Sequence, residues 1–91
     1  SKAGMIQLAR YLAMHYGPDD IRVNCIAPGP FPNPVAQAAN PDFVNTLNQK
    51  TMLRRIGRNN EMLGPVLFLL SDQASYVTGQ TLSVDGGWTA W

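Results

Sequence analysis

The hydrophobic and polar positions of residues 21–27 predict a buried β-strand. Apolar side chains alternate with Arg22 and Asn24, and the run ends in apolar residues that fall on both faces. Its length and β-branched side chains favour a strand over a short helix. Pro28 lacks a backbone N–H and Gly29 allows a sharp turn, so we expect the strand to end there. Ligands of parallel α/β sheets bind beyond the carboxyl ends of strands, although a Pro-Gly pair is also an ordinary turn.

Apolar residues at three- and four-residue intervals predict a helix over residues 2–16. One stripe consists of Met5, Ile6, Ala9, Leu12, Ala13 and Tyr16. A second, adjacent stripe consists of Leu8, Tyr11 and His15. The apolar arc is therefore wider than a one-sided surface helix requires. We expect one side to lie on the sheet and the other to be buried in the same domain or against a partner subunit. Gly17 and Pro18 predict the end of the helix.

After the first strand, four prolines within residues 28–34 predict an extended loop. Residues 35–53, the lid segment, follow with a short helical turn at 35–39. A second helix follows this turn, with Asn40 as its cap and Pro41 at its first position. Segments of this kind close over substrates in many enzymes, and a mobile surface helix is the alternative.

A further helix and a second strand complete the predicted elements. The helix starts at residues 59–61, and Pro65 implies that regular helix either begins near that residue or bends there. Residues 81–84 alternate and are rich in β-branched side chains, which predicts the final strand. Trp88 and Trp91 follow it. We expect a subunit contact or the rim of a pocket to cover their large apolar surfaces.

Composition excludes several classes of partner. The net charge is +1 and only 14% of residues are charged, so we expect no nucleic-acid partner. Arg54, Arg55 and Arg58 form the one basic cluster, which most simply is a solvated face. No apolar run is long enough to span a membrane. The single cysteine fits a reducing cytoplasm, and the single histidine has no partner at metal-ligand spacing.

Six short motifs, in their order and spacing, resemble the C-terminal part of a short-chain dehydrogenase/reductase. They are Ser1-Lys2 at a helix start, Ile21-Arg22-Val23-Asn24, Pro28-Gly29, Arg55-Ile56-Gly57-Arg58, Tyr76-Val77-Thr78-Gly79-Gln80 and Val84-Asp85-Gly86-Gly87. The resemblance covers the whole chain. It implies an α/β fold in which residues 1–91 form the C-terminal portion of a single doubly wound, parallel-sheet (Rossmann-type) domain, without its N-terminal cofactor-binding part.

The resemblance assigns Lys2 a catalytic and cofactor-binding role. In the family a tyrosine lies four residues before the lysine on the same helical face, here upstream of Ser1. Tyrosine titrates near pH ~10 unaided. An ammonium about 4 Å away, at an effective dielectric constant of about 20, favours the phenolate by up to ~4 kcal/mol, or ~3 pKa units. The same ammonium can donate hydrogen bonds to cofactor ribose hydroxyls. Without the other motifs, Lys2 would be an ordinary solvated side chain.

The resemblance also implies that the proline-rich loop passes the nicotinamide of NAD or NADP. Pro28 and Gly29 begin this loop. Backbone groups around Pro30 and Phe31 would face the carboxamide, and the Phe31 ring would cover one flank of the nicotinamide. The family often has a threonine four residues after the glycine, where this chain has Asn33, which can also donate and accept hydrogen bonds. A rigid surface loop is the plainer alternative.

The implied activity is hydride transfer between nicotinamide and an alcohol or carbonyl substrate. The tail, residues 85–91, is most similar to members acting on sugar acids and polyols, such as gluconate 5-dehydrogenase. A 3-oxoacyl-carrier-protein reductase is the alternative within the family. A noncatalytic oligomerisation or interaction module is the alternative from another class. We expect a homo-oligomer, a dimer or tetramer, through helix 2–16 and the tail. Without the tyrosine and the Gly-rich loop, the chain alone should be inactive and poorly folded.

Overall fold

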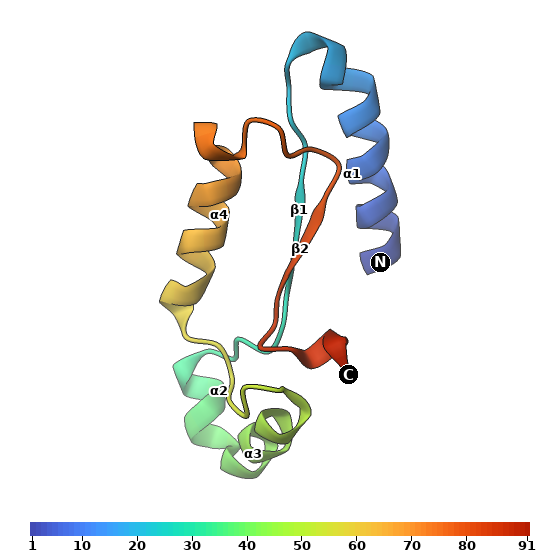
Figure 1. The fold of residues 1–91 in the computed structure, drawn as a ribbon. Helices are drawn as coiled ribbons and strands as arrows, with labels where there is room; N and C mark the ends of the chain where they lie inside the picture. The colour runs from blue at the N-terminus through green and yellow to red at the C-terminus, as the bar shows by residue number, and fades with distance from the viewer.

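Two parallel strands form the centre of the structure, a computed structural model that describes residues 1–91. β1 (Cys25–Pro28) pairs with β2 (Thr81–Val84), and Pro28 lies opposite Val84. Parallel strands need a crossover connection. This connection contains α2 (Pro34–Ala39), α3 (Pro41–Lys50) and α4 (Leu63–Leu70). The carboxyl ends of both strands therefore lie at one edge of the sheet, toward the bottom of Figure 1.

α1 (Lys2–Tyr16) and α4 lie on either side of the strands in Figure 1. α1 approaches the sheet through small side chains, because Ala9 and Ala13 are its only buried residues. Its other side is exposed and presents Met5, Leu8, Tyr11 and Met14. The expectation that one side lies on the sheet is therefore confirmed. Met5 was expected in the buried stripe but is 64% exposed.

The end of α1 differs in detail from the prediction. The helix covers residues 2–16 as predicted, but Gly17 keeps a right-handed helical conformation with φ −53°. A 3₁₀ turn, Gly17–Asp19, follows it and places Pro18 at its start, where the missing N–H costs no hydrogen bond. Asp20 reverses the chain instead, with φ 61°, and its N–H donates to the Gly17 carbonyl at 2.9 Å.

β1 ends at Pro28 as predicted but begins only at Cys25, later than the predicted start at residue 21. The residues before it are tied to the second half of the chain by side chains. The Val23 N–H donates to Thr78 Oγ1 at 3.0 Å. The Asn24 amide group donates to the Val77 carbonyl at 2.9 Å and accepts from the Gln80 N–H at 3.1 Å.

Arg22 fastens the same segment to the end of α4. Its guanidinium donates to the carbonyls of Leu69 and Ala74, both at 2.8 Å, and to that of Ser71 at 3.2 Å. Carbonyl groups at the end of a helix have no partner within the helix, so the guanidinium satisfies acceptors that would otherwise need water. Two of the six motifs, residues 21–24 and 76–80, thus contact each other directly, through the bonds of Val23 and Asn24.

The remaining elements follow the sequence closely. α2 and α3 form the lid segment, and the final strand covers residues 81–84 as predicted. Asn40 precedes α3 as predicted, but its side chain makes no capping hydrogen bond. Residues Asn59–Met62 form a 3₁₀ turn, and regular helix starts at Leu63. Of the two possibilities left open for Pro65, the structure therefore has it in the first turn of α4.

Little of the chain is buried. The buried residues are Ala9, Ala13, Ala27, Ala74 and Thr51. Large apolar side chains of α4 are exposed as well, with Leu63 at 59% and Leu70 at 74%. None of the helices is both long enough and apolar enough to span a membrane.

Candidate active site at the carboxyl edge of the strands

Loops from both strands meet Lys2 at the carboxyl edge of the sheet. They enclose a cavity of about 310 Å³, the Lys2 pocket. It is lined by Lys2, Pro28, Gly29, Pro30, Asp85, Trp88 and Thr89. Four of the six predicted site residues are therefore brought together, in the position where parallel sheets bind ligands.

Gly29 allows the two loops to approach each other. A Cβ placed on Gly29 would lie 2.6 Å from both Cα and Cβ of Asp85, which is too close for any larger residue. The Gly29 N–H donates to the Val84 carbonyl at 3.0 Å and so extends the pairing of the strands by one bond. The glycine of the Pro-Gly pair is needed for this contact between loops.

Asp85 organises the wall of the pocket opposite β1. Its carboxylate accepts from the Gly87 N–H at 3.0 Å, the Thr89 N–H at 3.1 Å and the Thr89 hydroxyl at 2.7 Å. These bonds, the Thr89 hydroxyl first, lower the pKa of Asp85 despite an opposing effect of burial, and the positive charge of Lys2 lowers this pKa further. The pocket therefore carries an ionised carboxylate as well as an ammonium.

The Lys2 ammonium has its donors available. Lys2 lies in the first turn of α1, and the Ser1 hydroxyl oxygen caps this helix by accepting from the Gly4 N–H at 3.2 Å. The Lys2 side chain takes part in no salt bridge and no hydrogen bond. Three N–H donors beside an exposed loop backbone fit the hydroxyls of a ribose, so this donor set is compatible with a nicotinamide dinucleotide.

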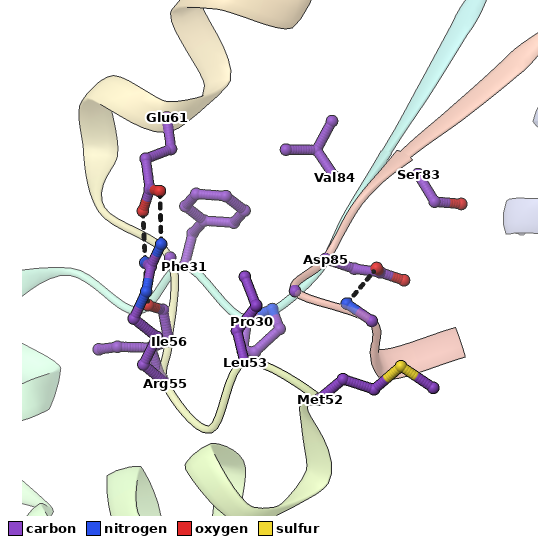
Figure 2. Close-up of a pocket in the computed structure, with 13 residues that line it drawn as sticks. Pro30, Phe31, Met52, Leu53, Arg55, Ile56, Glu61, Ser83, Val84 and Asp85 are labelled. Carbon is purple, nitrogen blue, oxygen red and sulfur yellow. Dashed lines mark hydrogen bonds and ion pairs between the residues drawn. The ribbon is translucent and has the colours of Figure 1, made fainter. Parts of the chain in front are cut away.

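A second cavity of about 440 Å³, the Phe31 pocket, adjoins the first and shares Pro30 and Asp85 with it (Figure 2). The Phe31 ring lies against Gly57, where a Cβ would collide with the ring. The Gly57 N–H donates to the Pro30 carbonyl at 2.9 Å. Gly57 thus fixes the proline-rich loop and places Phe31 in the cavity next to Lys2 rather than in the Lys2 pocket itself.

Asn33 lines neither of these cavities. It precedes α2, and its side-chain oxygen accepts from the Ala36 N–H at 2.8 Å as a helix cap. The amide nitrogen of Asn33 makes no hydrogen bond within the chain, so its two donors remain available.

Glu61 and Arg55 brace the loop beneath Phe31, as Figure 2 shows. The guanidinium binds the carboxylate through two bonds of 2.6 and 2.7 Å, and the Arg58 N–H donates to the same carboxylate at 2.8 Å. The hydrogen bond from Arg55 is the main reason why the pKa of Glu61 falls to about 2. The expectation of a solvated basic face is therefore wrong for Arg55, whose guanidinium is ion-paired with Glu61. The sequence did not reveal this pair because the two residues lie six positions apart across a turn.

Two residues of the Lys2 pocket, Asp85 and Thr89, were missed by the sequence predictions, whereas Trp88 lies at a pocket, one of the two places expected for it. They lie more than 80 residues from Lys2, and no local pattern connects them with it. The available signal was the pair of parallel strands, because residues that follow Val84 must lie beside residues that follow Pro28.

Comparison with known proteins identifies the family. A family model described as enoyl-(acyl carrier protein) reductase matches residues 1–89. A crystal structure titled short chain dehydrogenase, from Leptospira borgpetersenii with bound NAD+, is 45% identical with a TM-score of 0.84, and the match covers 97% of this chain and 33% of that one. The chain belongs to the short-chain dehydrogenase/reductase family. The Rossmann-type fold class predicted from the sequence is confirmed, with residues 1–91 forming only a part of such a domain.

Two further relatives of this short-chain dehydrogenase/reductase chain have named activities. The structure of a 4-hydroxyisoleucine dehydrogenase complexed with NADH is 32% identical with a TM-score of 0.90, over 99% of this chain and 38% of that one. A 3-oxoacyl-(acyl-carrier-protein) reductase of Chlamydia trachomatis is 42% identical over 87 residues, which are 96% of this chain and 35% of the relative. The chain thus spans about a third of the length of these relatives. None of them is a gluconate 5-dehydrogenase.

Proposed function

We propose that residues 1–91 are the C-terminal part of an NAD(P)-dependent oxidoreductase that acts on an alcohol or carbonyl substrate. The observation that carries this proposal is the Lys2 pocket, in which an ammonium with available donors faces the Pro28–Pro30 loop at the carboxyl edge of the strands. The bound dinucleotides named for two similar structures, NAD+ and NADH, support the choice of cofactor.

Each predicted site residue has a role in this proposal. When bound, a nicotinamide dinucleotide supplies the carrier of the hydride. Lys2 binds the ribose hydroxyls and, by its charge, lowers the pKa of a phenol four residues earlier on the same helical face. The backbone from Pro28 to Pro30 walls the nicotinamide side of the pocket, and Phe31 in the adjoining cavity covers one flank of the nicotinamide. Asn33 donates a hydrogen bond to the cofactor from its amide nitrogen, which helix capping leaves available.

The first substrate candidate is a 3-oxoacyl thioester, because a reductase of that class is 42% identical to this chain. A sugar acid or polyol is the second candidate. It is supported by the Asp85 carboxylate and the Thr89 hydroxyl, which line the Lys2 pocket and can bind substrate hydroxyls.

We further propose that a second copy of the chain covers the exposed side of α1. Met5, Leu8, Tyr11 and Met14 are each more than half exposed there. Replacing Leu8 by Glu should then lower the oligomeric state of the longer chain in sedimentation, and an unchanged state would contradict this interface.

A cytoplasmic location is part of the proposal. It is supported by Cys25, which is a free thiol and suits a reducing compartment.

Nicotinamide absorbance of the longer chain that carries residues 1–91 provides the test. NADH and NADPH are each combined with a 3-oxoacyl thioester, and NAD+ and NADP+ with gluconate and simple polyols. We expect turnover with at least one of these pairs of cofactor and substrate. We also expect the sequence of the longer chain to have a tyrosine four residues before Lys2. Absence of turnover together with absence of dinucleotide binding would favour the noncatalytic module.

A further inference from the structure

The tail, residues 85–91, contacts two functional parts of the molecule at once. Asp85, Trp88 and Thr89 line the Lys2 pocket. The rest of the tail contacts residues 50–54, which end the lid segment and include the residue directly after it. We propose that the tail is a latch that holds the lid helix α3 beside the Lys2 pocket and so determines how tightly substrate is bound. This inference rests on the proposed function of that pocket.

Two hydrogen bonds to backbone carbonyls join the tail to the lid segment. The Trp91 indole N–H donates to the Lys50 carbonyl at 2.8 Å, which satisfies a carbonyl at the end of α3 that has no partner within the helix. The Leu53 N–H donates to the Gly86 carbonyl at 3.0 Å. Each bond joins a tail residue to the lid segment across more than 30 positions of sequence.

Side-chain packing brings the tail and lid segment closer than ordinary residues allow. Gly87 has φ 89°, and a Cβ placed on it would lie 2.6 Å from Cβ of Met52. A residue other than glycine would therefore be strained in its backbone and would push the lid segment away. The tail follows its present path because glycine stands at this position.

Both tryptophans of the tail face cations, Lys50 within the lid segment and Arg54 directly after it. The Lys50 ammonium lies 5.7 Å from the centre of the Trp88 ring, and the Arg54 guanidinium lies 5.6 Å from that of Trp91. Trp88 also lines the Lys2 pocket, so one ring connects the lid segment with the proposed site. The two rings lie three residues apart, Trp88 at the start of a 3₁₀ turn, Trp88–Ala90, and Trp91 directly after it.

The tail is better fixed than the helix it holds. Three bonds to the Asp85 carboxylate fix residues 85–89 independently of the lid segment. In contrast, α2 and α3 contain no buried residue. Within residues 1–91, α3 is therefore held by a small number of contacts, which include those with the tail and the hydrogen bond from the Ile56 N–H to Asn48 Oδ1 at 2.9 Å.

The latch is tested by Trp91→Ala in the longer chain, with Ala90→Ser as the matched tail control and Trp91→Phe as the variant that keeps an aromatic ring but loses the indole donor. Loss of a hydrogen bond and a cation–π contact should raise KM for the substrate roughly tenfold. The kcat and the dinucleotide Kd should stay within about twofold, and amide hydrogen exchange across 44–50 should accelerate. Trp91→Phe should lie between the wild type and Trp91→Ala.

Two results would overturn the latch: exchange and KM for Trp91→Ala equal to those of Ala90→Ser, or faster exchange with an unchanged KM. A wild-type chain without turnover or dinucleotide binding would instead contradict the proposed function. In that case the exchange comparison still decides whether the tail holds α3, because it needs no substrate.

Discussion

Glu61 holds the loop that carries Gly57 beneath Phe31, because its carboxylate binds both the Arg55 side chain and the Arg58 backbone. Its pKa is lowered from 4.5 to about 2. A carboxylate whose pKa is lowered in the folded state stabilises the fold above its unfolded pKa and loses this effect as the pH falls through its folded pKa. We therefore expect Glu61→Gln to be less stable than the wild type at pH 7, with a difference that shrinks from pH 4.5 to about 2.

Urea unfolding of the longer chain at a series of pH values measures this difference between Glu61→Gln and the wild type. A stability difference that stays constant across the acidic range would show that the ionised pair does not stabilise the loop.

Lys2 is the residue on which the proposed chemistry depends. Loss of its ammonium in Lys2→Ala should reduce kcat by about 100-fold or more, because a positioned group assisting proton transfer contributes on that scale. Arg10→Ala is the matched control, since Arg10 is an exposed cation on the same helix, outside the Lys2 pocket. Steady-state kinetics and circular dichroism of both variants give the comparison. Turnover of Lys2→Ala within about twofold of wild type would remove the assigned role.

At the scale of elements, the approach of the two strand ends depends on Gly29. The added Cβ of Gly29→Ala would collide with Asp85, so we expect a loss of about 1–3 kcal/mol in the free energy of unfolding and weaker dinucleotide binding. Gly64→Ala provides the control, because a Cβ at Gly64 meets no atom within 4 Å and Gly64 lies within α4. That substitution should stabilise the longer chain by about 0.5–1 kcal/mol. Similar effects of both substitutions in urea unfolding would contradict the close approach.

Local periodicity was sufficient to predict most elements. The helix over residues 2–16 and the strand over 81–84 were predicted with their observed bounds, because their signals lie within their own residues. The first strand was predicted too long at its start, because Val23 and Asn24 bind residues more than 50 positions away through side chains. Such partners leave no local pattern in a single sequence. The same limitation hid Asp85 and Thr89 from the predicted site.

At the scale of the whole molecule, the exposed apolar surface predicts that residues 1–91 alone are not stably folded. Only five of the 91 residues are buried, too few to offset the conformational entropy lost on folding. Near-ultraviolet circular dichroism and hydrogen exchange of the isolated chain should show weak aromatic signals and little amide protection. A cooperative thermal unfolding transition of the isolated chain would contradict this expectation.

The proposal as a whole requires that a dinucleotide binds where Lys2 meets the Pro28–Phe31 loop. A crystal structure of the longer chain with NAD(H) or NADP(H) tests this requirement most directly. We expect the Lys2 ammonium within about 3 Å of a ribose hydroxyl, with the nicotinamide against the loop. A dinucleotide bound away from this loop, or a Lys2 side chain directed into solvent, would contradict it.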